Sequence, residues 1–154
     1  MRQSDLLVKA VMECLKARFH VADKAVPEFG LPGGFPVPLK MGVDEDKEGA
    51  EYVLFQIEEL DEIVAGNRTY HAEVSVELYL SAHDRTADEA RVMQAWLEER
   101  LREVDKAGLN ALEEKVPYRH FYVIGAVRLE PGKGVEAREE AYAAAWRMTV
   151  PVQF

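Results

Sequence analysis

Residues 70–81, YHAEVSVELYLS, carry the clearest structural signal in this chain. Every second residue from Tyr70 to Leu80 is apolar, and most of the residues between them are polar or charged. Alternation with a period of two is typical of a β-strand that buries one face and exposes the other. This segment is therefore predicted to form a long, half-buried strand with His71 on its solvent-facing side.

A second strand is predicted just before this one, over residues 52–60, YVLFQIEEL. Strict alternation places Tyr52, Leu54 and Gln56 on one side of it and Val53, Phe55 and Ile57 on the other. The intervening residues Ala65-Gly66-Asn67 favour a chain reversal, so we expect the two strands to pair as a hairpin.

Two amphipathic helices are expected, one on each side of this hairpin. The first covers Ser4 to Phe19, and the second begins at Thr86, which forms a Thr-x-x-Glu capping box with Glu89. Gly108 is a suitable end for the second helix. Its predicted apolar stripe consists of Ala90, Met93, Trp96, Leu97, Leu101 and Val104.

The C-terminal part of the chain is predicted to add two more strands. The segment YRHFYVIGAVRLE, residues 118–130, is typical of a strand, and PGKG, residues 131–134, is typical of a turn or loop. The last strand alternates from Tyr142 to Phe154. Because Pro151 has no amide hydrogen to donate, the end of this strand is expected at a sheet edge or outside the ladder.

The resulting order is αββαββ, which predicts an α+β fold with a mainly antiparallel sheet and two helices packed on one face. The chain has 154 residues, of which 48% are hydrophobic and 31% are charged. That length and composition suit one globular domain spanning residues 1–154.

A proline- and glycine-rich segment at residues 27–42, PEFGLPGGFPVPLKMG, interrupts this pattern. No long regular element is expected there. Phe29, Leu31 and Phe35 are spaced along it and support two hypotheses. They pin a loop to the protein's own core, or they form an arm that contacts another subunit or partner.

The charge balance excludes some classes of protein. The chain carries 19 basic and 28 acidic residues, a net charge of -9, which argues against sequence-specific nucleic-acid binding and against binding to anionic membranes. Nine of the acidic residues lie between Asp44 and Glu62. The run Asp44, Asp46, Glu48, Gly49 starts like a calcium-binding loop, but the twelfth position, which requires a bidentate carboxylate, is Phe55. A solvated acidic surface, or one that lines a ring, is the favoured interpretation.

Catalytic chemistry has no clear motif here. Cys14, the single cysteine, lies on an apolar helix face, and no Gly-x-Ser-x-Gly elbow is present. His83 lies at a strand-to-helix junction, but a polar turn explains it better than catalysis. The four histidines lack metal-binding spacing. We therefore expect no catalytic residue, no metal site, no cofactor and no membrane-spanning segment.

Two segments resemble the tail terminator (tail completion) proteins of long-tailed bacteriophages and related phage-like particles. In residues 76–101, VELYLSAHDRTADEARVMQAWLEERL, a strand closes on a short polar turn and enters a long amphipathic helix. Residues 141–154, AYAAAWRMTVPVQF, form a final strand with a tryptophan and alternating apolar positions. The size, the αββαββ order and the amphipathic N-terminal helix are also similar to the family.

The resemblance implies a structural virion protein without enzymatic turnover. Such a protein forms a homo-oligomeric ring, commonly a hexamer, that caps the tail tube and meets the head-tail connector. It is located in the virion tail or neck, and in the host cytoplasm during assembly. Two alternatives stay open: a neck or head-completion protein of the same particle, and a small ligand-binding or enzymatic α+β domain.

Overall fold

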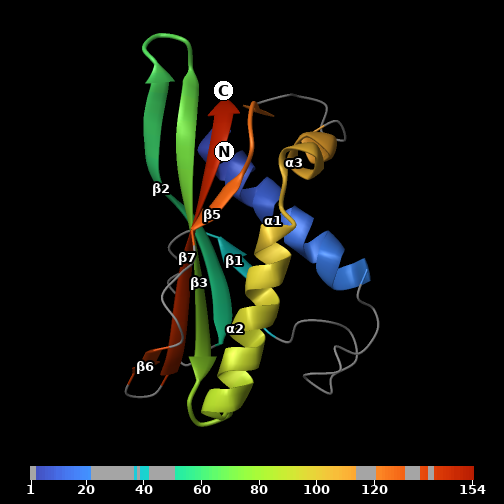
Figure 1. Cartoon of the computed structure of the whole chain (residues 1–154), viewed down its shortest axis with the longest axis vertical. Helices are drawn as coiled ribbons and strands as arrows, with labels where there is room; N and C mark the ends of the chain where they lie inside the picture. The colour runs from blue at the N-terminus through green and yellow to red at the C-terminus, as the bar shows by residue number, and fades with distance from the viewer. Residues whose placement is uncertain are drawn as a thin grey trace.

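The computed structural model describes residues 3–21, 37, 39–41, 51–113, 121–130, 136–138 and 141–154. These residues form a mixed α/β structure, compatible with the predicted α+β class (Figure 1). Its elements in chain order are α1 (Gln3–Val21), β1 (Leu39–Met41), β2 (Tyr52–Val64), β3 (Thr69–Ser81), α2 (Ala87–Arg102), α3 (Lys106–Glu113), β4 (Tyr122–Val123), β5 (Arg128–Glu130), β6 (Glu136–Arg138) and β7 (Ala141–Gln153).

The strands form one sheet with the order β1-β2-β3-β7-β4, and β5 and β6 also pair with β7. The β2–β3 hairpin is antiparallel as predicted, and its turn contains Gly66 at a φ of 81°. Strand β7 pairs with β3 along its whole length, from Ala141 opposite Ser81 to Gln153 opposite Thr69. The one parallel pair among the described strands joins β1 to residues Val53–Phe55 of β2.

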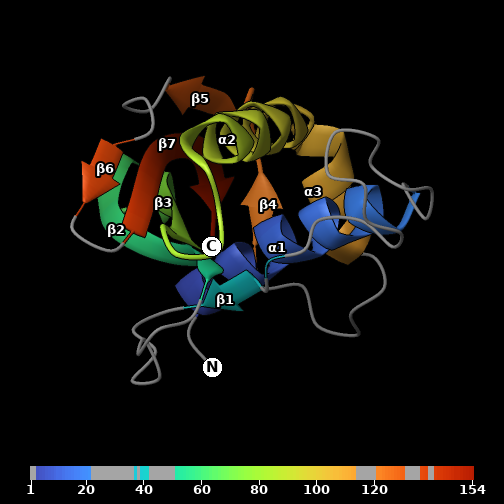
Figure 2. The same cartoon turned by 90° about the horizontal axis from the view of Figure 1, so that it is seen from below.

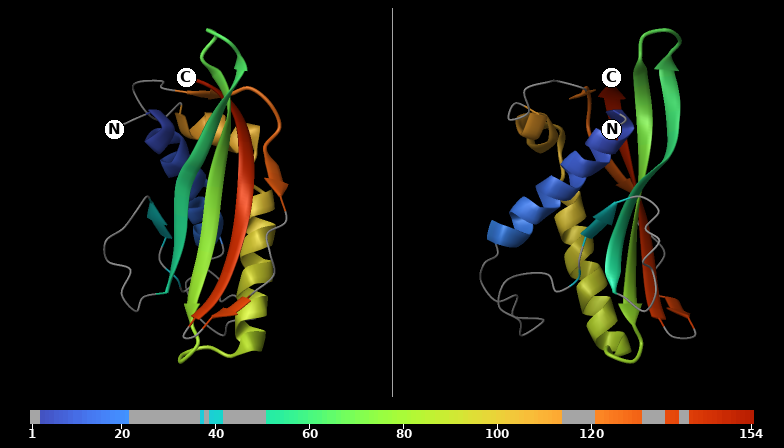
Figure 3. Two further views of the ribbon diagram at one scale, coloured as in Figure 1. Left: turned by 90° about the vertical axis from the view of Figure 1, so that its left-hand side faces the viewer. Right: turned by 180° about the vertical axis from the view of Figure 1, so that it is seen from behind.

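All three helices lie on one face of this sheet, which curls around them (Figures 2 and 3). Helix α1 packs against β1, β2 and α3, whereas α2 packs against β5 and β7. The long β2–β3 hairpin runs to one end of the molecule, past the last residues of β7 (Figure 1). None of the described helices has the long apolar run that crossing a membrane requires.

The core between helices and sheet confirms the main predicted apolar stripes. Helix α2 begins at the predicted capping box, where Thr86 Oγ1 accepts a hydrogen bond from the Glu89 amide at 3.2 Å. Trp146 Nε1 donates to Glu98 Oε1 at 3.2 Å and fastens α2 to β7. The largest fully buried side chains are Leu7, Val11, Leu15, Leu54, Phe55, Leu78, Leu80, Met93, Leu97, Leu101, Leu109 and Met148.

The predicted end of the second helix at Gly108 is wrong. Helix α2 ends at Arg102, and Gly108 lies inside the additional helix α3. The cause is Asp105, whose carboxylate accepts a hydrogen bond from the Gly108 amide at 2.8 Å. An aspartate that accepts from the amide three residues onward caps a new helix, so the chain restarts there instead of continuing into a loop.

The single strand predicted over residues 118–130 is also wrong over its described part. Two short strands, β4 and β5, are separated at Gly125, where an added Cβ would lie 3.1 Å from Pro151 Cγ. Pro151 itself lies inside the β3–β7 ladder, opposite His71, and not at a sheet edge as expected. The gap between β4 and β5 gives room to the proline ring.

The exact αββαββ order is not confirmed, because a third helix and short strands are present. One of these strands, β1, lies in the proline- and glycine-rich segment, where no long regular element was expected, and it has three residues. Phe29, Leu31 and Phe35, and the PGKG segment, lie outside the described residues, so both hypotheses for the arm stay predictions.

Candidate functional site

Strand β2 has two halves with opposite environments. Tyr52 to Phe55 are buried, and β1 pairs with this half. From Glu58 to Val64 every side chain is exposed, including three large apolar ones: Leu60 at 39%, Ile63 at 42% and Val64 at 52%. Among the described strands, none pairs with the outer edge of this second half. We call residues 58–64 the hairpin edge.

A β-bulge decides which side chains of the hairpin edge share a face. The register between β2 and β3 shifts between Ile57 and Glu59, so that Glu59 lies opposite Glu73. Glu59 and Asp61 therefore share a face with Glu73, on the side of the sheet away from the helices. Leu60 lies opposite the buried Ala72 and takes the other face.

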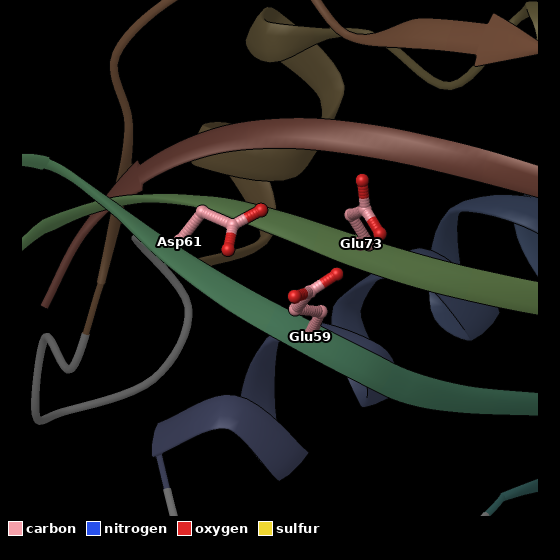
Figure 4. A group of neighbouring side chains, drawn as sticks. All are labelled: Glu59, Asp61 and Glu73. Carbon is pink, nitrogen blue, oxygen red and sulfur yellow. The ribbon is translucent and has the colours of Figure 1, made fainter.

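Three carboxylates gather on the outer face of the hairpin as a result. One carboxylate oxygen from each of Glu59, Asp61 and Glu73 lies within 4.8 Å of the others, and Figure 4 shows them projecting from two adjacent strands. Arg147 on β7 approaches from the side, with nitrogens 3.3 Å from a Glu58 oxygen and 3.8 Å from a Glu73 oxygen. One guanidinium, that of Arg147, thus lies beside a group of four carboxylates: Glu58, Glu59, Asp61 and Glu73.

The charge of this carboxylate group is not fully balanced. Repulsion from Asp61, and next from Glu73, raises the pKa of Glu59 above its usual value of 4.5, although Arg147 acts in the opposite direction. A raised pKa on an exposed carboxyl group means that its negative charge is unfavourable where it stands. A cationic partner would relieve that repulsion.

The hydrogen-bond pattern of the sheet shows which backbone N–H and C=O groups of the hairpin edge point away from β3. The Ile124 amide donates to the Pro151 carbonyl oxygen at 2.9 Å, so the backbone polar groups of Pro151 face β4 and not β3. By the same alternation, those of the opposing residue, His71, face β2. In the next strand Asp61 then faces β3, and Leu60 and Glu62 direct their N–H and C=O groups outward. The hairpin edge therefore presents two donors and two acceptors.

The opposite edge of the sheet at this end is closed. Asn110 on α3 donates from Nδ2 to the Val123 carbonyl oxygen at 3.0 Å and accepts from the Val123 amide at 2.9 Å. These two bonds occupy the backbone groups of β4 that face away from β7. The neighbouring side chains Tyr122 and Ile124 are exposed, but the backbone of β4 is not open to another strand.

Of the residues singled out in the sequence, His71 lies nearest to the carboxylate group. It is opposite Asp61 and is exposed on the outer face, as predicted, whereas His83 is exposed in the turn after β3. Cys14 is half-buried and packs against the core. Within the acidic run, Asp44, Asp46 and Glu48 lie outside the described residues.

Glu51, from the same acidic run, has a structural contact instead. Both of its carboxylate oxygens accept hydrogen bonds from the Arg85 guanidinium, at 3.0 and 2.8 Å. This pair joins the start of β2 to the turn before α2. It gives Arg85, at the strand-to-helix junction, a structural contact.

Sequence reasoning missed the carboxylate group and the closed edge. Glu73 and Arg147 belong to the predicted polar sides of their strands, but strict alternation in β2 would put Glu59 and Asp61 on the face of Val53. Only the bulge brings them beside Glu73, and no residue in the segment marks it. Asn110 could not be assigned because α3 itself was not predicted.

Comparison of the sequence with models of known protein families gives no match, and comparison with curated proteins gives none either.

Proposed function

We propose that this protein is a structural assembly subunit of a phage or phage-like particle, similar to the tail terminators. In this role it forms a homo-oligomeric ring, commonly of six copies, that caps the tail tube and joins it to the head-tail connector. The αββαββ order serves as the framework of this proposal, with α3 and the short strands as additions to it. Turnover of a substrate is not part of the role.

The exposed hairpin edge is the observation that carries the assembly role in this proposal, as a contact surface for another component of the particle. Seven consecutive residues at the end of a well-formed hairpin are exposed, and three of them are large and apolar. Apolar side chains gathered on an ordered, protruding element are typical of a surface that another protein covers. The carboxylates beside them fit a passage for DNA, since like charges keep the polyanion from binding.

The native mass of the purified protein tests the proposal. Static light scattering should give about 104 kDa for six copies of the 17.4 kDa chain, and negative-stain images of the same fraction should show rings. A neck or head-completion protein of the same particle would be distinguished by which component it binds: the purified tail tube or the connector. Binding to the connector alone would contradict the tail-terminator role.

The competing class, a small ligand-binding domain, is favoured by the carboxylates of Glu59, Asp61 and Glu73. Hard cations such as Ca²⁺ bind carboxylate oxygens, but they require more ligands than these three exposed groups supply. A thermal-shift titration with Ca²⁺, Mg²⁺ and Mn²⁺ separates the two classes. A saturable rise in the melting temperature of a monomer would support the ligand-binding domain and contradict the assembly role.

A further inference from the structure

We infer that the hairpin edge binds an extended segment of a different protein by strand addition, and that this segment alternates basic and apolar side chains. The inference names a partner chemistry for the surface used above, and it rests on the proposed role only in assuming that this surface serves assembly. The geometry of the hairpin edge does not depend on ring formation.

The backbone provides the first part of the argument. Leu60 and Glu62 direct two N–H and two C=O groups away from β3, and the described residues provide no partner for them. An open sheet edge of this kind pairs readily with an incoming strand, whose own main chain supplies the matching groups. Since β1 ends its pairing at Phe55, no described strand competes with an incoming strand along the hairpin edge.

The side chains provide the second part, because they specify the incoming strand. On the outer face it would lie beside Glu59 and Asp61, so its residues on that face should be lysine or arginine. On the other face it would lie beside the exposed Glu62 and beside Leu60, which is 39% exposed, so its residue next to Leu60 should be apolar. The expected pattern is basic and apolar residues in strict alternation.

Neither the hairpin edge nor the β4 edge of a second copy fits that description. Two hairpin edges paired with each other would bring Glu58, Glu59, Asp61 and Glu62 of both copies together, and like charges on adjacent strands are destabilising. Pairing with the β4 edge is blocked, because Asn110 already holds the outward backbone groups of Val123. Charge and geometry therefore both favour a different, basic partner.

A short fluorescent peptide of alternating lysine and valine tests the inference by fluorescence anisotropy at low salt. The protein should bind it and should not bind the alternating glutamate-valine peptide. Two further lysine-valine peptides carry N-methyl groups on alternate amides. In one peptide the odd-numbered amides are methylated, and in the other the even-numbered amides are. Strand addition requires that one of them lose binding and the other keep it, whereas equal binding of both would overturn the inference and indicate charge attraction only.

Protein variants locate the site. Glu59→Gln with Asp61→Asn should weaken binding of the lysine-valine peptide by at least about tenfold. The matched control, Asp84→Asn with Glu99→Gln, removes the same charge from exposed positions away from the hairpin and should change the affinity less than about twofold. Equal weakening by both double variants would overturn the proposed site.

Amide hydrogen exchange provides a direct readout on the unmodified protein. Bound peptide should slow exchange at Leu60 and Glu62, whose amides face outward, and leave Asp61, which faces β3, nearly unchanged. Unchanged exchange at Leu60 and Glu62 would overturn strand addition. Native mass keeps the two proposals apart: a monomer that binds the peptide contradicts the ring alone, and a ring that does not bind it contradicts this inference alone.

Discussion

The ion pair between Glu51 and Arg85 holds three elements together through two side chains. The Glu51 carboxylate also accepts a hydrogen bond from the Ser81 amide at 3.0 Å, so it links the start of β2, the end of β3 and the turn before α2. Both side chains are less than 20% exposed. Removing one partner leaves the other poorly solvated, which is where the cost of breaking such a pair arises.

Arg85→Ala should therefore lower the free energy of unfolding by about 2 kcal/mol at pH 7. Burial raises the pKa of Glu51, but the hydrogen bonds from Arg85 and the Ser81 amide outweigh it, and the net pKa lies below the usual 4.5. A lowered pKa means that the contribution is complete above pH 4.5 and is lost as the pH falls through the lowered value. Urea unfolding at several pH values measures this; an equal loss at pH 7 and pH 2 would contradict it.

The ionisation of Glu59 should change stability in the opposite direction to that of Glu51. Because its pKa is raised in the folded protein, its charge opposes folding at neutral pH, and stability increases as the pH falls through the raised value toward 4.5. Glu59→Gln should therefore raise the melting temperature at pH 7 in low salt, and the gain should shrink in high salt and vanish below pH 4.5. Glu99→Gln is the control, and a lower melting temperature for Glu59→Gln at pH 7 would refute this interpretation.

Single residues also mark the limit of sequence reasoning. The Thr86 and Glu89 capping box could be predicted because both hydrogen bonds are local and depend on a spacing of three residues. The bulge after Ile57 could not, since its cause lies in the fit between two strands and not in either sequence alone. The carboxylate group depends on that bulge, so it could not be predicted from the sequence either.

At the scale of elements, length decided what could be predicted. Strands β3 and β7 and helix α2 each repeat their apolar pattern many times. Their predicted positions are confirmed, except that α2 ends at Arg102 and not at Gly108. Strands β1, β4, β5 and β6 have two or three residues each, too few to show a period, and they form because a longer strand offers them a partner. Helix α3 is likewise too short to show a clear period in the sequence, and it depends on its Asp105 cap.

Asn110 provides the test at this scale, because one side chain replaces a missing neighbour strand. Asn110→Ala should lower the free energy of unfolding by about 1–3 kcal/mol, the net value of two hydrogen bonds to partly buried backbone groups. It should also speed exchange of the Val123 amide. Asn67→Ala, in the exposed hairpin turn, should change stability by less than about 0.5 kcal/mol. An unchanged exchange rate at Val123 would show that another group protects that edge.

For the whole molecule, the α+β class and the placement of helices on one face followed from the sequence, because the alternating strands and helical stripes each need an apolar partner. The resemblance to tail terminators stays a prediction about assembly. Its sharpest test on the chain itself concerns the segment that contains Phe29, Leu31 and Phe35, which lies outside the described residues.

Replacing Phe29, Leu31 and Phe35 together with serine should leave a folded protein of lower native mass, because an arm that contacts another subunit contributes to assembly and not to the core. Circular dichroism reports the fold, and light scattering reports the mass. Serine at Leu60, Ile63 and Val64 is the comparison, since those side chains are exposed in the subunit. Loss of the fold in the first variant would place the three residues in the core.

The two edges of the sheet at the hairpin end have unequal capacity, since Asn110 fills one and no described strand pairs with the other. In the language of polymer chemistry, a unit that can react at both ends propagates a chain, and a unit that can react at one end stops it. At this end of the sheet the protein is monofunctional: once a strand has joined β2, the hydrogen-bonded network ends at β4. Such a subunit can complete a β-structure made by another protein without seeding an endless one.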